Sequence, residues 1–144
     1  MEIGNVTMAQ AIDIFVNELS ETIPPIIGGC NELQLLNLSQ NAFQGPIPNS
    51  LKNLQSLANL DLSSNCLLGP ILIVTLQKLQ MLQSLNFSFN NLIGEVPKGW
   101  IFEKKNIVMS LIGNPILFGP QAFQLPILST FEIPLEMEYV YERL

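Results

Sequence analysis

The sequence predicts an α/β-type solenoid, in which short repeats form a right-handed coil with a parallel β-sheet on its concave face. Apolar–polar–apolar triplets recur along the 144 residues, at positions 12–14, 36–38, 60–62 and 85–87. Successive triplets therefore begin 24, 24 and 25 residues apart. An asparagine follows each triplet in the same register, at Asn17, Asn41, Asn65 and Asn90. Chance does not keep this register over four repeats.

Each repeat begins with a pattern that is typical of a short strand. In residues 35–39 the alternation places Leu36 and Leu38 in the core, and it places residues 35, 37 and 39 on the outer face. Further along the repeat, leucines three residues apart are expected to close the convex side in 3₁₀ or loop segments. They are Leu51, Leu54 and Leu57, matched by Leu76, Leu79 and Leu82.

The asparagines are expected to point inward, where the amide group satisfies backbone groups as the chain leaves the strand. This ladder of Asn17, Asn41, Asn65 and Asn90 is interpreted as structural. Glycines at 45, 69 and 94 permit a turn that side chains would block, and Pro48 directs the exit. A period of this length with these features is typical of a leucine-rich repeat.

The third repeat departs from the pattern. Gly69 and Leu76 are seven residues apart, whereas Gly45 and Leu51 are six apart, and apolar residues 72–74 replace the usual proline-polar exit. We therefore expect a bulge at this point, with an exposed apolar patch that is prone to association.

The repeat pattern also predicts the organisation of the chain. About four repeats occupy residues 12–110, and residues 1–11 are expected to be the tail of a truncated repeat because residues 3–5 are in phase with 27–29. The array is thus expected to start in its middle. The composition, 48% hydrophobic and 12% charged, suits a continuous core.

Charge and hydropathy exclude several classes of partner. The net charge is −6 and no basic stripe is present, so a nucleic-acid partner is not expected. The first residues lack the basic start and apolar core of a signal peptide. The apolar runs are shorter than the roughly 20 residues that a membrane helix needs. We expect neither a signal peptide nor a membrane helix in this chain.

The sequence offers no catalytic constellation. Histidine is absent, and the two cysteines have no zinc-site spacing. The glycine-rich loop and the catalytic aspartates of kinases are also missing. The sequence therefore predicts that the chain is not an enzyme and that it has no metal or cofactor.

The two cysteines fall at different phases of the repeat. Cys30 is in phase with Leu54 and Leu79, which predicts a small buried residue, whereas Cys66 is in phase with Ala42 and Asn91 and is expected near the surface. A bridge between them is not expected. Two free thiols fit poorly with an oxidising compartment.

We expect a ligand-binding surface on the outer face of the strands. Stacking aligns the outward positions into columns, and the middle column alternates carboxylate and amide groups. One interpretation is that this column forms hydrogen bonds to a peptide. The other is that Asp or Asn is simply the usual residue of the repeat at this position. Phe15 replaces a serine and is either a binding hot spot or the mark of a decayed repeat. The candidate binding residues are Asp13, Phe15, Asn37, Ser39, Asn59, Asp61, Ser84 and Asn86.

Three sequons mark potential N-glycosylation sites, at Asn5, Asn37 and Asn86. Two of them coincide with the strand pattern and so arise easily. A glycan at Asn37 or Asn86 would cover the concave face, which argues against ligand binding at that place.

Several segments resemble the plant-specific leucine-rich repeat, among them Asn-Ala-Phe-Gln-Gly-Pro-Ile-Pro at 41–48 and Asn-Asn-Leu-Ile-Gly-Glu-Val-Pro at 90–97. Residues 99–102, 110–115, 117–119 and 124–126 resemble the carboxy-terminal cap of plant leucine-rich-repeat receptor-like serine/threonine kinases, in the immune-receptor subfamily. The resemblance covers residues 1 to about 128. It implies a degenerate C-terminal cap at 111–128 and leaves 129–144 as a tail of unknown structure.

The chain departs from that family at the cap. The family has cysteines where Phe118 and Leu128 stand, so its cap disulfide is not expected here. Loss of such a bridge typically costs about 2–5 kcal/mol in a small secreted domain.

The resemblance implies a non-catalytic protein-binding module, a fragment of a receptor-like kinase ectodomain in defence or developmental signalling. The implied partners are a protein or peptide ligand and a co-receptor kinase. The parent would lie at the plasma membrane as a glycoprotein, with this part extracellular. Two alternatives stay open: a soluble leucine-rich-repeat inhibitor or decoy of a secreted enzyme, and a non-functional truncated gene product.

Overall fold

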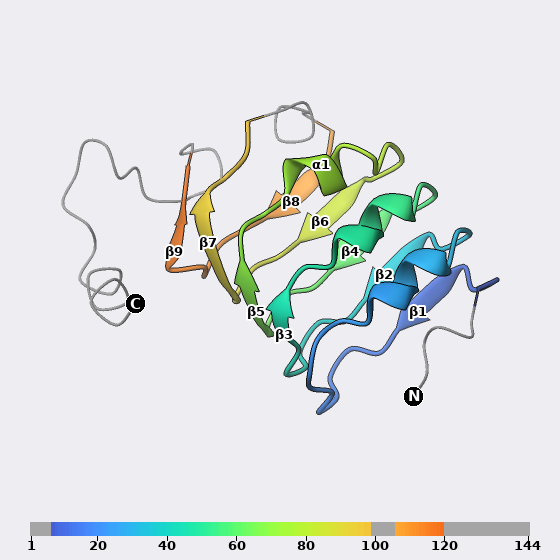
Figure 1. Cartoon of the computed structure of the whole chain (residues 1–144), viewed down its shortest axis with the longest axis horizontal. Helices are drawn as coiled ribbons and strands as arrows, with labels where there is room; N and C mark the ends of the chain where they lie inside the picture. The colour runs from blue at the N-terminus through green and yellow to red at the C-terminus, as the bar shows by residue number, and fades with distance from the viewer. Residues whose placement is uncertain (1–6, 99–105, 120–144) are drawn as a thin grey trace.

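The computed structural model describes residues 7–98 and 106–119. These residues form coils stacked side by side, with a sheet along each of two faces and short helices on the convex side (Figure 1). The predicted solenoid with parallel strands is confirmed. Asn5, most of the predicted tail 1–11, Leu128 and residues 129–144 lie outside the described residues.

One strand from each coil contributes to a five-stranded parallel sheet of order β1-β2-β4-β6-β8. Equivalent positions of the repeat are direct partners, since Leu36 pairs with Ile12 on one side and with Leu60 on the other. The period in the sequence is therefore the register of the sheet. Its strands are β1 (Ala11–Asp13), β2 (Leu35–Asn37), β4 (Asn59–Asp61), β6 (Ser84–Asn86) and β8 (Val108–Ser110).

A second parallel sheet has four strands in the order β3-β5-β7-β9, which follow Asn41, Asn65, Asn90 and Asn114. The repeat pattern did not predict it. Its glycines at 45, 69 and 94 have φ of 71°, 82° and 87°, in the left-handed region that glycine adopts without strain. The strands are β3 (Gln44–Pro46), β5 (Cys66–Gly69), β7 (Asn91–Glu95) and β9 (Ile116–Phe118).

Short helices cover the convex side, namely the 3₁₀ helices η2 (Pro25–Gly29) and η3 (Asn49–Asn53) and the single α-helical turn α1 (Ile73–Leu76). The prediction of a bulge in the third repeat is wrong, because the chain forms the turn α1 there. Its extra residue is accommodated because α1 uses a wider turn, in which the Gln77 amide donates to the Ile73 carbonyl at 2.9 Å. Leu72 and Val74 are exposed, whereas Ile73 packs against the core. Association through this patch stays a prediction.

The core is a column of leucines that no single coil can enclose. The predicted inward residues are buried on both sides of the coil, including Leu36, Leu38, Leu51, Leu54 and Leu57. Neighbouring coils also approach through their backbones. A β-carbon added at Gly28 would lie 2.5 Å from the carbonyl oxygen of Ser50, so η2 and η3 pack this closely only with glycine there.

The asparagine ladder joins each coil to the coil before it. The side-chain carbonyl of Asn65 accepts the Phe43 amide at 3.0 Å, and its amide donates to the carbonyls of Leu38 at 3.0 Å and Leu62 at 3.1 Å. Asn41 and Asn90 repeat this arrangement, whereas the exposed side chain of Asn17 bonds, among the described residues, only within its own coil. The predicted inward direction is thus confirmed for the inner members.

A left-handed residue precedes each asparagine of the ladder. Val16, Gln40, Ser64 and Phe89 have φ between 54° and 56°, although none is glycine. This conformation costs about 1 kcal/mol for an ordinary residue. It turns the chain so that the following asparagine points into the coil, and the hydrogen bonds of the ladder offset the cost.

The coil pattern continues beyond residue 110. Strand β8 pairs with β6, β9 pairs with β7, and Asn114 extends the ladder by accepting the Leu92 amide at 3.1 Å. Asn114 follows Asn90 by 24 residues, which is the signal that sequence reasoning missed. The first part of the predicted cap therefore has the geometry of a fifth coil, and Phe118 lies in its strand β9.

Because Asn65 is buried and serves two coils, replacement by alanine leaves backbone donors and acceptors without partners. We expect Asn65→Ala to lower the free energy of unfolding by about 3 kcal/mol. Asn17→Ala, at the exposed end of the ladder, should cost less than about 1 kcal/mol. Urea denaturation followed by circular dichroism measures both, and equal losses would contradict a ladder that joins coils.

Candidate functional site

The candidate binding surface is the outer face of the five-stranded sheet. Its middle column contains Asp13, Asn37, Asp61 and Asn86 as direct partners on neighbouring strands, and Ser110 continues it on β8. Neighbouring strands in a sheet lie about 4.8 Å apart. The column is thus a regular row of polar groups along the solenoid.

The column before it is more varied. Ala11 and Asn59 are exposed, Leu35 and Ser84 are half-buried, and Val108 is exposed at the last strand. Asn59 and Ser84, both predicted site residues, are direct partners on adjacent strands. The structure thus brings six of the predicted residues together in two adjacent columns, namely Asp13, Asn37, Asn59, Asp61, Ser84 and Asn86.

The third column differs from the prediction, because its serines are buried. The Ser39 hydroxyl donates to the Asn37 side-chain carbonyl at 2.7 Å, and the Ser39 amide donates to the same oxygen at 3.1 Å. The expectation that Ser39 faces outward is therefore wrong, since this local clamp folds its side chain under the preceding polar residue. Ser63 and Ser88 make the same clamp, to Asp61 and Asn86 at 2.6 Å.

The clamp also determines what the middle column offers to a ligand. One oxygen of each polar side chain is occupied by its own serine. Within the described part of the chain, the side-chain amides of Asn37 and Asn86 and the second oxygen of Asp61 have no hydrogen-bond partner. The row therefore presents a donor, a charged acceptor and a donor, held at a fixed orientation.

The first coil lacks this arrangement. Phe15 stands where the other coils have serine, and its side chain is 50% exposed beside the exposed Val16. Without a serine, Asp13 is not clamped as Asp61 is. Phe15 and Asp13 together thus form an apolar and acidic end to the candidate surface.

Two sequons lie on this surface. Asn37 and Asn86 are half-buried, and each has its side-chain carbonyl engaged by the serine of its own sequon. Glycosylation at Asn37 and Asn86 stays a prediction.

The cysteines lie as the repeat phase predicts. Cys30 is buried, Cys66 is exposed, and both are free thiols. Burial raises the pKa of the Cys30 thiol above its ordinary value.

Residues 7–98 and 106–119 contain no group of three or more His, Cys, Asp or Glu side chains that could hold a metal ion. No helix among them is long and apolar enough to cross a bilayer.

The Leucine Rich Repeat family model matches residues 32–54 and 81–101 of the chain. Together with the stacked parallel strands, this match shows that the fold is that of a leucine-rich-repeat solenoid. No curated protein sequence matches the chain.

The fold is that of plant receptor-kinase ectodomains. The ectodomain of the receptor kinase SOBIR1 from Arabidopsis thaliana is 33% identical, with a TM-score of 0.74 over 82% of this chain and 64% of that one. A plant ice-binding protein is 33% identical, with a TM-score of 0.72 over 84% of this chain and 39% of that one.

The Arabidopsis receptor kinase HAESA, in complex with the peptide hormone IDA and the co-receptor SERK1, is also similar. It is 28% identical, with a TM-score of 0.68 over 81% of this chain and 19% of that one. The chain thus spans less than two thirds of each of these three relatives.

The serine clamps have nearly equal lengths but different acceptors, a carboxylate at Asp61 and a neutral amide at Asn37. Hydrogen bonds to charged groups are the stronger ones. We expect Ser63→Ala to lower the free energy of unfolding by about 2 kcal/mol and Ser39→Ala by about 1 kcal/mol. Urea denaturation of the two variants tests this order, and a larger loss for Ser39→Ala would contradict it.

Because Cys30 is buried and its pKa is raised, it should not react in the folded protein. We expect a thiol reagent such as dithionitrobenzoate to label only Cys66 in buffer and both cysteines in denaturant. Cys66→Ser should abolish the labelling in buffer. Rapid labelling of that variant without denaturant would show that the core at Cys30 is open.

Proposed function

We propose that the chain is a non-catalytic protein-binding module, part of a plant receptor-like kinase ectodomain, that recognises a protein or peptide ligand. The observation that carries the proposal is the polar row of Asn37, Asp61 and Asn86. Each member is fixed by its serine and keeps an outward group free within the described residues. Preorganised side chains bind with a smaller loss of conformational entropy.

An extended peptide suits this row. A peptide backbone offers alternating carbonyl and amide groups, and the row offers donors at Asn37 and Asn86 on either side of an acceptor at Asp61. The similar receptor kinase HAESA is in complex with a peptide hormone and a co-receptor. By analogy, a co-receptor kinase is the second partner that we propose for the parent of this chain.

The analogy also supplies the proposed context. The parent would be a plasma-membrane glycoprotein with this part outside the cell, acting in defence or developmental signalling. Recognition on this surface needs no cofactor. In the family that the chain resembles, the kinase activity belongs to a separate domain.

The test is selection of ligands from a random peptide library displayed on phage, followed by Kd measurement. Asp61→Asn is the decisive variant, because it keeps the oxygen that Ser63 clamps and replaces only the outward oxygen with an amide. Neighbouring coils already carry asparagine at this position, so the fold should be kept, with the free energy of unfolding lower by about 1 kcal/mol because the clamp loses its charged acceptor. We expect selected peptides to bind this variant about ten-fold more weakly, which is the effect of losing a charged hydrogen bond.

Glu95→Gln is the matched control, because Glu95 is exposed on β7 in the other sheet. It should leave Kd unchanged. Ser84→Arg, which places a large side chain beside the row, should also block binding. Peptides that bind Asp61→Asn and Ser84→Arg as tightly as the unchanged chain would show that the ligand site is elsewhere.

A further inference from the structure

The two carboxylates of the middle column, Asp13 and Asp61, lie two strands apart. Asp13 pairs with Asn37, and Asn37 pairs with Asp61, so one amide stands between two acids. Neighbouring strands are about 4.8 Å apart, which places the two acids about 9.6 Å from each other along the solenoid. A ligand that neutralises both acids therefore needs cationic groups at this spacing on one side of its chain.

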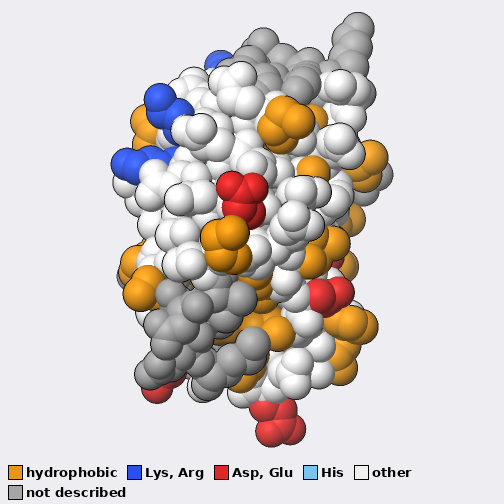
Figure 2. Space-filling model, turned by 90° about the vertical axis from the view of Figure 1, so that its right-hand side faces the viewer, with side chains coloured by type: hydrophobic (Ala, Val, Ile, Leu, Met, Phe, Trp, Pro, Cys, Tyr) orange, Lys and Arg blue, Asp and Glu red, His pale blue; other side chains and the backbone are white. Residues whose placement is uncertain are grey.

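The chain supplies no cation to these acids from the same sheet. The basic residues of the described ranges are Lys52, Lys78 and Lys98, and none belongs to a strand of the five-stranded sheet. Figure 2 views the molecule from the side of β1, and its visible basic side chains lie toward the upper edge, with the acidic ones below them. Asp13 is exposed and Asp61 is half-buried, so an external cation can reach both.

The spacing of the acids distinguishes between two conformations of a bound peptide. In a β-strand the side chains alternate sides at about 3.4 Å per residue, so groups on one side are about 6.8 or 13.6 Å apart. A polyproline II helix has three residues per turn and rises about 3.1 Å per residue. Every third side chain therefore lies on the same side, about 9.3 Å from the previous one. The polyproline II repeat matches the spacing of Asp13 and Asp61, and the β-strand repeat does not.

The hydrogen-bonding groups of the column suit the same conformation. The side-chain amides of Asn37 and Asn86 are donors, and the carbonyl of each side chain already accepts from its own serine. A polyproline II backbone has no internal hydrogen bonds, so its carbonyls are free to accept. Proline has no backbone N–H, so a proline-rich ligand needs few acceptors. The outward oxygens of the two acids are then left for cations.

We propose that the middle column binds a proline-rich peptide in the polyproline II conformation, with basic residues three positions apart. One basic side chain pairs with Asp13 and the next pairs with Asp61. Asn37 donates to a peptide carbonyl between them, and Asn86 donates to a carbonyl beyond the second basic residue. The recognised pattern is basic–Pro–Pro–basic. This inference rests on the proposed function, because it names the class of peptide for the same surface.

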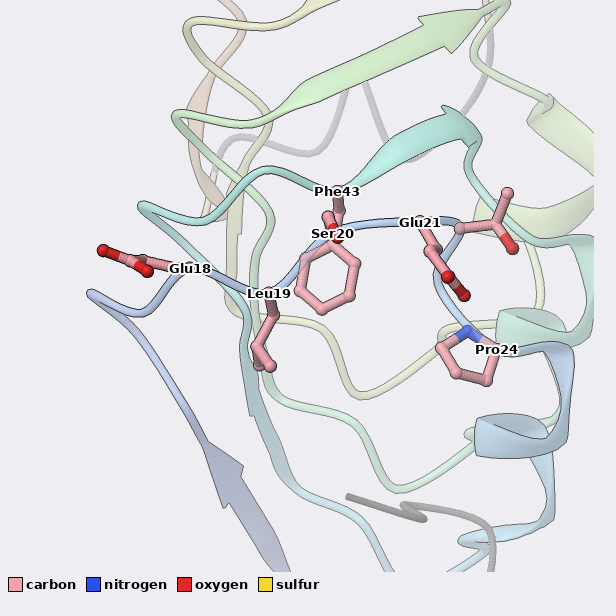
Figure 3. A pocket seen from close by; sticks show the side chains of 7 residues that line it. Glu18, Leu19, Ser20, Glu21, Pro24 and Phe43 are labelled. Carbon is pink, nitrogen blue, oxygen red and sulfur yellow. The ribbon is translucent and has the colours of Figure 1, made fainter.

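Two other acids of the first coil provide matched controls. Glu18 and Glu21 line an open cavity of about 360 Å³ over the Phe43 ring, beside β3 (Figure 3). They lie next to the four-stranded sheet, whereas Asp13 and Asp61 belong to the five-stranded sheet. Neutralising one of them changes the net charge of the chain as much as neutralising an acid of the column does.

The probe is a fluorescent peptide, Pro-Pro-Lys-Pro-Pro-Lys-Pro-Pro, blocked at both ends and titrated with the chain in a fluorescence-anisotropy assay. We expect saturable binding that weakens with salt. Pro-Pro-Lys-Pro-Lys-Pro-Pro-Pro has the same composition but places its lysines on different sides of the helix. It should bind about two- to five-fold more weakly, which is the effect of losing one exposed ion pair. Equal binding of the two peptides would overturn the proposal.

A third peptide tests the conformation. Ser-Ser-Lys-Ser-Ser-Lys-Ser-Ser keeps the lysines three residues apart but lacks the prolines that hold the polyproline II helix. It should bind more weakly than the first peptide, because the chain must order it on binding. Binding as tight as that of the first peptide would contradict recognition of this helix.

Substitutions in the column test the two ion pairs separately. Asp61→Asn should weaken binding of the first peptide about ten-fold, as for the selected peptides. Asp13→Asn should weaken it about two- to five-fold, because Asp13 is exposed and is not clamped by a serine. Glu18→Gln and Glu21→Gln should leave Kd unchanged. Unchanged binding by Asp13→Asn, or an equal loss with Glu18→Gln, would overturn the proposal.

The peptides selected from the phage library separate this inference from the proposed function. Selected peptides that depend on Asp61, lack basic residues three positions apart and tolerate Asp13→Asn would overturn the ligand class and keep the proposed function. Selected peptides that do not depend on Asp61 would overturn both. Enrichment of basic residues three positions apart among prolines is the result that we expect.

Discussion

The structure depends on one side chain repeated in every coil. The amide group of an inner ladder asparagine bonds to the backbone of its own coil and of the coil before it, as Asn65 does with Leu62 and Leu38. A single residue therefore sets both the turn within a coil and the register between coils. Because these bonds replace water at buried backbone groups, the cost of removing one exceeds that of an exposed hydrogen bond. The leucine core can stack only in the register that the ladder allows.

The candidate surface is a consequence of that register. Once equivalent residues are direct partners, any side chain that faces outward becomes part of a row. The serine clamp then orients the row, because each polar side chain is held by a serine two residues later and cannot rotate freely. The structural clamp of the repeat and the binding surface that we propose thus use the same atoms.

The ends of a solenoid differ from its middle for the same reason. Every inner coil both donates and accepts backbone hydrogen bonds with each of its two neighbours, whereas the first described coil does so with one neighbour among the described residues. Asn17 is exposed there, Phe15 interrupts the clamp, and the cavity over Leu19 and Phe43 opens at the same end.

The sequence by itself determined the inward leucines, the columns of the five-stranded sheet and the direction of the inner asparagines. These features depend on a strand period of two and on contacts that repeat at a fixed spacing, so they follow from the local sequence of each repeat. Only the tertiary structure decided that Ser39 is buried, that α1 replaces the expected bulge and that a second sheet forms. The 24-residue step from Asn90 to Asn114 was already present in the sequence. The second sheet depends on where the backbone of one coil meets the next, and no single repeat contains that information.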